Sequence, residues 1–527
     1  MAAKPADNPA AANHQRALAL SNEADRTVKV NVDAAIAKYT EALQLEPNNV
    51  DVLWKLSRAH DRKEDWVAVA ATLERASRLE PHVANYAHWR GHALVQLAQE
   101  SASTDSAPKT YEAAREPLTT CLKLDPKLAD CAFLLGQVEE ATEHAQAAAE
   151  RYMQAIANDP LQARPYLALA LLFRVYKQEQ QAEMVLVQGM QVLEANERNR
   201  SDRAAMAVLL ANLSGQRHDS TTRSAWLEKS EELASEYTPA LLFEVGAMYV
   251  EPSVASALPA NKERAVRLLN SFSKRVCRGA AAAKYKLQCE RAQSLLEQAT
   301  SPYVRSVAAK PAPAVVPLPS GMPQPQLARQ GVRDGNAFTV WGAAYYLRNP
   351  HLQRQVMDKP IMITGFVTKT NLMQAPPCVV HRAGEADPEN CHAEIPAFWL
   401  GDYPDAPEQD CIKVMGFASN YSQILEAIRL ADSVRPELPY EDAFWGQVIP
   451  NPLPAAGAKL RVRGNYGLSF AKASSGAEMN PVMGLLDYTS SDVLQHAPQL
   501  ATLPGVKRVK QPVKYQIMPH NPNRYLP

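Results

Sequence analysis

A proline-terminated segment recurs along the first third of the chain and restricts its fold more than any other feature. AIAKYTEALQLEP ends at Pro47, and looser copies end later: AATLERASRLEP at Pro81, AREPLTTCLKLDP at Pro126 and AAERYMQAIANDP at Pro160. The spacings of 34, 45 and 34 residues indicate a period of 34 with an insertion near 101–109. Proline cannot continue a helix, so each copy predicts a helix that ends just before it. The period predicts a stack of similar helical units.

Small residues recur at matching places in these units. Gly91 and Gly136 lie at equivalent points of the preceding helices, where a side chain would block close packing. Matching small or aromatic positions hold Ala35, Ala42, Ala76, Ala114, Ala148, Ala155, Tyr39 and Tyr152. This pattern resembles the tetratricopeptide repeat (TPR) family, in which helix-turn-helix units form a solenoid. The resemblance implies about seven units over 14–298, the last of them followed by a capping helix, AAAAKYKLQCERAQSLLEQ.

A proline-rich stretch follows the repeats. Residues 302–326 contain seven prolines and no acidic residue, a composition that blocks both helix and sheet. We therefore expect a semi-extended linker over 299–335. The alternative is an ordered strap that lies over the solenoid.

Beyond the linker, the pattern changes to that of β-strands. IMITG (361–365), IKVMG (412–416) and LRVRG (460–464) share an apolar-x-apolar-x-Gly pattern, and FWLGDY and VMGLLDYTS supply two more strands. A short helix is expected in NAFTVWGAAYYLRNPHLQRQV and another in NYSQILEAIRL. This layout resembles an OB-fold barrel of the anticodon-binding-like type, with an unrelated small α+β domain as the alternative.

The predicted fold class is therefore mainly α, a TPR-like solenoid followed by a small β-rich, OB-like α+β domain over 336–492. A basic tail, 493–527, would end the chain; it contains Lys507, Arg508, Lys510 and Lys514.

Charge argues against nucleic-acid binding. The chain has 56 basic and 56 acidic residues in total. Residues 378–411 hold eight carboxylates against a single Arg382, although phosphates would require positive charge there.

The loop CVVHRAGEADPENCH groups four metal-ligand side chains: Cys378, His381, Cys391 and His392. The C-x2-H half suits zinc, whereas the adjacent Cys391 and His392 point to opposite sides of an extended chain. The loop is therefore interpreted as unliganded, with a zinc site or a Cys378–Cys391 disulfide as alternatives. No other cofactor is expected.

The cysteines and the N-terminus predict a cytoplasmic location. Seven scattered cysteines favour reduced thiols over a disulfide framework. The first twenty residues lack a charged region followed by an unbroken apolar run, and no later window holds about eighteen apolar residues.

The TPR resemblance also implies a binding surface. In this family the first helices of successive pairs line a concave groove that binds peptide segments or helices of partner proteins. The matching groove positions hold Trp54, Arg58, Asn85, His88, His92, Asp130, Phe133 and Gln137. This aromatic and polar mixture is typical of an interface with anchor residues. Alternatively, Trp54 and Phe133 pack between neighbouring helices.

The sequence contains no phosphate-binding loop, nucleophile elbow, H-E-x-x-H or dinucleotide-binding fingerprint. We therefore predict a non-enzymatic scaffold that binds a protein partner in the solenoid groove and a second component through the β domain. The alternatives are a zinc- or nucleic-acid-binding barrel tethered by the repeats and, third, an enzyme of unrecognised class.

Overall fold

The computed structural model describes most of the chain, and its residues form two compact units that divide between Ala328 and Arg329. The described residues are 9–101, 106–194, 199–216, 219–234, 238–250, 259–279, 282, 285–300, 321–327, 330–372, 395–418, 440–442, 447–450, 453–472, 476–479 and 482–497.

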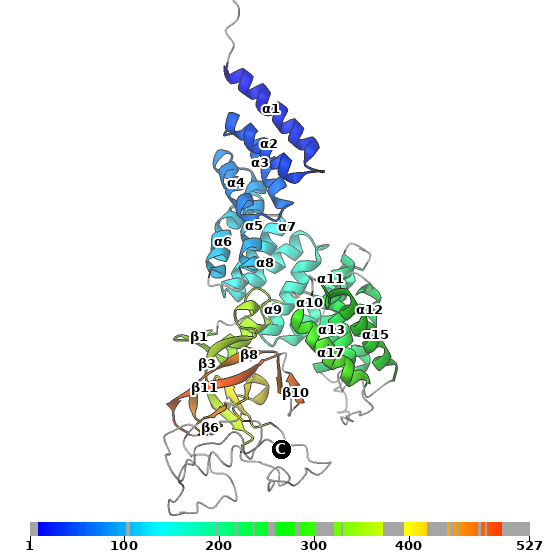
Figure 1. Ribbon diagram of the computed structural model, residues 1–527, viewed down its shortest axis with the longest axis vertical. Helices are drawn as coiled ribbons and strands as arrows, with labels where there is room; N and C mark the ends of the chain where they lie inside the picture. The colour runs from blue at the N-terminus through cyan, green and yellow to red at the C-terminus, as the bar shows by residue number, and fades with distance from the viewer. Residues whose placement is uncertain are drawn as a thin grey trace, which may run out of the picture. The chain divides into compact units, whose positions relative to one another are not determined.

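Helices that follow one another in pairs build the first unit (Figure 1). Seven pairs lie within its described residues: α1 (Pro9–Thr27) and α2 (Val32–Leu45), α3 (Val50–Asp61) and α4 (Trp66–Leu79), α5 (Ala84–Glu100) and α6 (Ala107–Leu124), α7 (Ala129–Ala141) and α8 (Ala145–Asn158), α9 (Ala163–Val175) and α10 (Glu179–Val192), α11 (Arg200–Gln216) and α12 (Ser220–Ala234), and α13 (Pro239–Val250) and α15 (Pro259–Val276). A last helix, α17 (Lys286–Thr300), packs on α15 and α13. The expected helical solenoid is confirmed.

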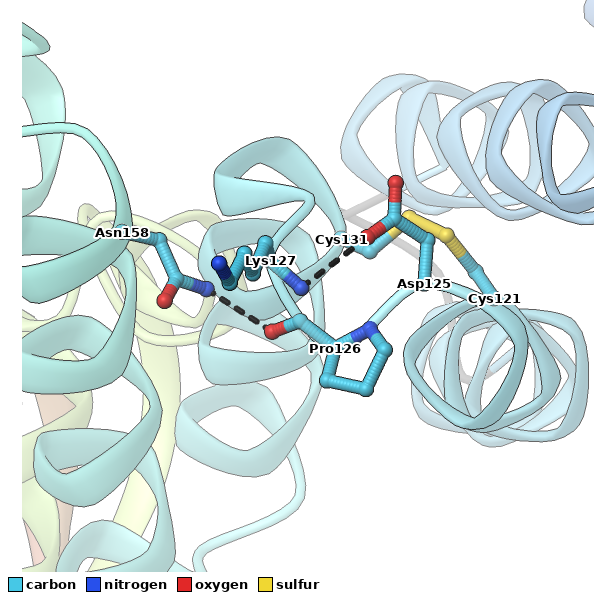
Figure 2. Close-up of a disulfide and its surroundings, with 6 residues drawn as sticks. All are labelled: Cys121, Asp125, Pro126, Lys127, Cys131 and Asn158. Atoms are coloured by element: carbon cyan, nitrogen blue, oxygen red, sulfur yellow. Dashed lines mark hydrogen bonds between the residues drawn. A yellow bond between two sulfur atoms is a disulfide. The ribbon is translucent and has the colours of Figure 1, made fainter.

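The repeated prolines lie in the turns between pairs. The second helices α2, α4, α6 and α8 each end two residues before their proline. The turn carbonyls then bind side chains of the next repeat: Arg75 Nη2 donates to Pro47 O at 2.9 Å, and Asn158 Nδ2 to Pro126 O at 3.0 Å (Figure 2). These carbonyls lie beyond the helix end, outside the hydrogen bonds of the helix. The side-chain hydrogen bonds therefore satisfy them and also join neighbouring repeats.

Within a pair, the two helices approach each other closely at glycine. A Cβ on Gly91 would lie 2.5 Å from the Leu118 side chain, and one on Gly136 would lie 2.6 Å from the Tyr152 ring. Tyr152 is completely buried, and its hydroxyl donates to Glu140 Oε2 at 2.6 Å. The predicted role of both glycines is confirmed. The small positions follow the same rule, since six alanines have no exposed surface: Ala35, Ala42, Ala76, Ala114, Ala148 and Ala155.

Two disulfides correct the expectation of reduced thiols. Cys121 at the end of α6 is bonded to Cys131 in α7, across the turn that contains Asp125 and Pro126 (Figure 2). Cys277 is bonded to Cys289 across the segment between α15 and α17. Sequence spacing did not reveal these pairs because helix pairing brings their Cα atoms to 6.3 and 5.6 Å.

The second unit is built on a closed five-strand barrel. Its strands pair in the order β3 (Lys359–Thr370), β4 (Phe398–Gly401), β5 (Ile412–Met415), β11 (Leu485–Gln495) and β8 (Lys459–Gly467), and β8 pairs back onto β3. The β5–β11 pair is parallel and the other barrel pairs are antiparallel. All five barrel strands contain segments that the sequence predicted as strands.

Shorter elements flank this barrel. Strand β2 (Ala337–Thr339) pairs with β1 (Arg333–Asp334) and runs parallel to β3, and the expected short helix is α18 (Val340–Arg348). Two further antiparallel pairs are β6 (Tyr440–Asp442) with β7 (Gln447–Ile449) and β9 (Ser469–Lys472) with β10 (Gly476–Met479). The helix predicted at 420–430 lies outside the described residues.

No helix within the described residues is both long enough and apolar enough to cross a membrane.

Replacing Gly136 by alanine should destabilise the solenoid by about 1–3 kcal/mol, because the new methyl group would overlap the Tyr152 ring. Gly189→Ala is the matched control: its Cβ would meet the Tyr166 ring at 3.0 Å, so the cost should be smaller. Urea unfolding followed by helical circular dichroism measures both. Equal stability of the Gly136→Ala variant and the wild type would contradict the close-approach account.

The double substitution Cys121→Ser, Cys131→Ser should lower the free energy of unfolding by about 2–4 kcal/mol, because the unfolded chain gains conformations.

Peptide mapping of the unreduced protein should recover Cys121 linked to Cys131 and Cys277 linked to Cys289. Free thiols at these four positions in the oxidised protein would disprove the assignment.

Candidate functional site

Helices α3, α4 and α5 bring together a group of aromatic, histidine and arginine side chains. Trp54 and Arg58 lie one turn apart on α3, and His88 and His92 lie one turn apart on α5, so each pair shares one face of its helix. We call the group the aromatic–arginine cluster; its members are Trp54, Arg58, Trp66, His88, Trp89 and His92.

Arg58 is held by aromatic rings. Its guanidinium carbon lies 3.7 Å from the centre of the Trp89 ring and 5.9 Å from that of Trp54. Its Nη1 lies 3.2 Å from Asp61 Oδ2, an ion pair without hydrogen-bond geometry. The side chain remains 38 % exposed. Stacking on indole positions the cation without consuming its hydrogen-bond donors, which suits the binding of a carboxylate.

The two histidines are largely buried between these rings. His88 is 9 % exposed and lies 5.3 Å from Trp89, centre to centre. His92 lies 5.6 Å from Trp66 and 5.3 Å from Trp89, and among the described residues its buried Nδ1 has no hydrogen-bond partner. Burial lowers the pKa of both imidazoles below the ordinary value of 6.5, so both are neutral at pH 7.

Charges on neighbouring helices modulate these pKa values. Asp61 of α3 and Asp130 of α7 raise the pKa of His92, while Arg58 of α3 and Arg164 of α9 lower it. For His88, Asp130 raises the pKa, and His92 and Arg58 lower it. The charges around the imidazoles of α5 therefore come from α3, α7 and α9, the first helices of their pairs.

The remaining groove positions differ in exposure. Asn85 and Asp130 are exposed, Gln137 is half-buried, and Asp130 accepts a hydrogen bond from Gln162 at 3.2 Å. Phe133, in contrast, is 7 % exposed, and its ring centre lies 5.9 Å from that of Tyr152 in the core. Phe133 therefore packs between helices, as the alternative interpretation supposed.

Trp54 is intermediate between these cases. It is half-buried, its ring centre lies 5.7 Å from that of Tyr86, and it packs beside Leu73 and Ala93. Its side chain thus both supports the helices and belongs to the cluster around Arg58.

Sequence reasoning missed Trp66 and Trp89 as members of the cluster. Neither was assigned to the groove, yet Trp89 makes the closest ring contact to Arg58. A usable signal existed: three of the seven tryptophans of the chain fall within residues 54–89.

The proposed zinc ligands Cys378, His381, Cys391 and His392 lie outside the described residues. Among the residues that the structure does describe, no group of three or more histidine, cysteine or acidic side chains could hold a metal ion.

No protein-family model and no curated protein matches the chain. Among solved structures, it is similar to a tetratricopeptide repeat protein from Parabacteroides merdae ATCC 43184, with 16 % identity, a TM-score of 0.38, and coverage of 55 % of this chain and 100 % of that one. It is also similar to MamA from Desulfovibrio magneticus RS-1, with 17 % identity, a TM-score of 0.31, and coverage of 34 % and 97 %. A third is YrrB, described as a TPR protein with an unusual peptide-binding site, with 18 % identity, a TM-score of 0.30, and coverage of 37 % and 95 %.

The buried histidines predict a stability that falls on acidification. Their pKa values are lowered in the folded state, so unfolding takes up protons. Their stabilising contribution is therefore complete above about pH 6.5 and is lost progressively below it. A His88→Gln, His92→Gln double variant should lose less stability than the wild type between about pH 7 and 5.

The measurement is the difference between the two unfolding curves at each pH. Taking this difference removes the contribution of Glu140 to the pH dependence of stability. Burial raises the pKa of Glu140 to about 7, so its contribution changes with pH in the opposite direction. Parallel pH profiles for the two proteins would show that the imidazoles titrate normally.

Proposed function

We propose that the chain is a non-enzymatic scaffold whose solenoid binds a segment of a partner protein at the aromatic–arginine cluster. The observation that carries this proposal is the stacking of Arg58 on Trp89, with Trp54 beside it. Arginine and tryptophan are the residue types that most often dominate binding energy at interfaces.

The cluster specifies the chemistry of the partner segment. The guanidinium of Arg58 favours a carboxylate, and the half-buried indoles favour an adjacent apolar side chain. The imidazoles of His88 and His92 are neutral at pH 7 and add no positive charge there. The segment would therefore combine one acidic group with an apolar anchor rather than a run of acidic residues.

The barrel would serve as a second binding module. As part of this proposal we assign the barrel to the OB-fold. The closed order of its five strands supports that assignment. Lys459, Arg461 and Arg463 alternate along β8 with the buried Leu460 and Val462, so they form a row of cations on the opposite face. Of the three, Arg463 is exposed and Arg461 is half-buried, and Lys459 is paired with Asp334 at 3.4 Å. This row favours an anionic component, and it is also the observation that favours the alternative of a nucleic-acid-binding barrel.

The two disulfides change the proposed location. Disulfides persist in oxidising compartments and are rare in the cytosol. Cys121–Cys131 and Cys277–Cys289 therefore support a site of action outside the reducing cytoplasm. This proposal replaces the cytoplasmic location expected from the sequence.

Selection of a displayed random-peptide library on the full chain tests the scaffold proposal. Enriched peptides should contain an acidic residue near an aromatic or aliphatic one. Arg58→Ala should weaken the best peptide about thirtyfold, equivalent to about 2 kcal/mol, as measured by fluorescence anisotropy.

Arg78→Ala provides the matched control. Arg78 lies on α4, is 73 % exposed and pairs with Glu74 of the same helix. Its removal should leave peptide affinity unchanged. If Arg58→Ala binds the selected peptides as tightly as Arg78→Ala does, the cluster is not the binding site.

A further inference from the structure

Residues 321–327, with the sequence GMPQPQL, lie against the solenoid although they belong to the predicted linker. Leu327 is 7 % exposed and belongs to the same core cluster as residues of α8 and α10, and Met322 packs against that cluster. Pro323 is buried, whereas Gln324 and Gln326 are exposed. The segment therefore presents apolar side chains to the solenoid and polar ones to solvent.

The side chain of one glutamine forms two hydrogen bonds with the backbone of this segment. Gln146 of α8 donates from Nε2 to Pro325 O at 3.2 Å and accepts at Oε1 from Leu327 N at 2.9 Å. The side-chain amide thus satisfies a carbonyl and the N–H two residues later, as a neighbouring strand would. Gln178, which precedes α10, donates to Gln326 O at 2.9 Å.

These contacts define a sequence preference. Proline is accepted at position 325 because only its carbonyl is used, but position 327 must supply an N–H and therefore cannot be proline. Leucine there fills the buried site. The prolines also restrict the free segment, which lowers the entropy lost on docking.

We propose that this surface of α8 and α10 is a second peptide-binding site, specific for an extended Pro-x-Pro-x-Leu segment and occupied by residues 321–327 of the same chain. It is built from second helices of the pairs and shares no residue with the aromatic–arginine cluster. A partner with the same segment would bind only by displacing the internal one.

A recess beside the bound segment favours such an exchange. It has a volume of about 360 Å³ and is lined by Gln178, Gln180, Gln181 and Met184 on the solenoid side, and by Pro323, Gln324 and Gln326 of the segment. An incoming segment makes its first contacts there, before the internal segment leaves. The bound segment carries no charge, so salt should have little effect on its docking.

A fluorescent synthetic peptide of residues 319–329 tests the proposal. It should bind the full chain with Leu327→Glu at least about tenfold more tightly than it binds the wild type. In that variant the internal segment no longer docks, whereas in the wild type it competes with the peptide at millimolar effective concentration. Adding Gln146→Leu to that variant should abolish binding. Val67→Glu, on α4 at a position that is 62 % exposed and outside both sites, is the matched control and should behave as the wild type does.

Equal binding to the wild type and the Leu327→Glu variant would overturn the proposal, as would no binding to that variant at millimolar peptide. Hydrogen exchange provides a readout that does not depend on this variant. The Leu327 amide should exchange more slowly in the wild-type chain than in the free peptide, and Gln146→Ala should remove that protection. A Leu327 amide that exchanges freely in the wild type would refute internal docking.

Discussion

The close approach of the two helices within a repeat is the constraint on which the rest of the solenoid depends. At Gly91 and Gly136 the neighbouring side chain lies so close that even a methyl group would overlap it. Alanines without exposed surface extend the same close packing along the stack. Pairs that follow one another also pack together, as α2 does on α3 and α4 does on α5. Residues 34 or so apart in the sequence thereby become neighbours.

The aromatic–arginine cluster is a product of this stacking. Arg58 on α3 meets Trp89 on α5 only because consecutive pairs are in register. The rings hold the guanidinium in place, and Asp61 balances its charge at ion-pair distance. Burial keeps His88 and His92 neutral, so Arg58 is the cation of the cluster at pH 7. Under the proposed function, this surface would select its ligand by one directed charge and a nearby apolar contact.

Features with a local physical cause could be predicted from the sequence. The prolines end helices, the glycines permit close packing, and the alternating segments form the barrel strands. Features that depend on distant residues could not. The Cys121–Cys131 bond needs the α6–α7 geometry, the ring contact of Trp89 needs α3, and the docking of Leu327 needs Gln146, 181 residues earlier. Phe133 shows a third limit, because its groove position in the family register did not reveal that it is buried.

The central claim is that the face carrying the aromatic–arginine cluster contacts a protein partner, and site-specific photocrosslinking tests it most directly. A photoreactive amino acid would replace exposed Asn85 on α5 in one protein and Val67 on α4, which is 62 % exposed, in another. After irradiation in an extract of the source cells, the account predicts a discrete adduct from position 85 that the Arg58→Ala substitution removes, and none from position 67. An adduct from position 67 alone, or one from position 85 that persists without Arg58, would contradict it.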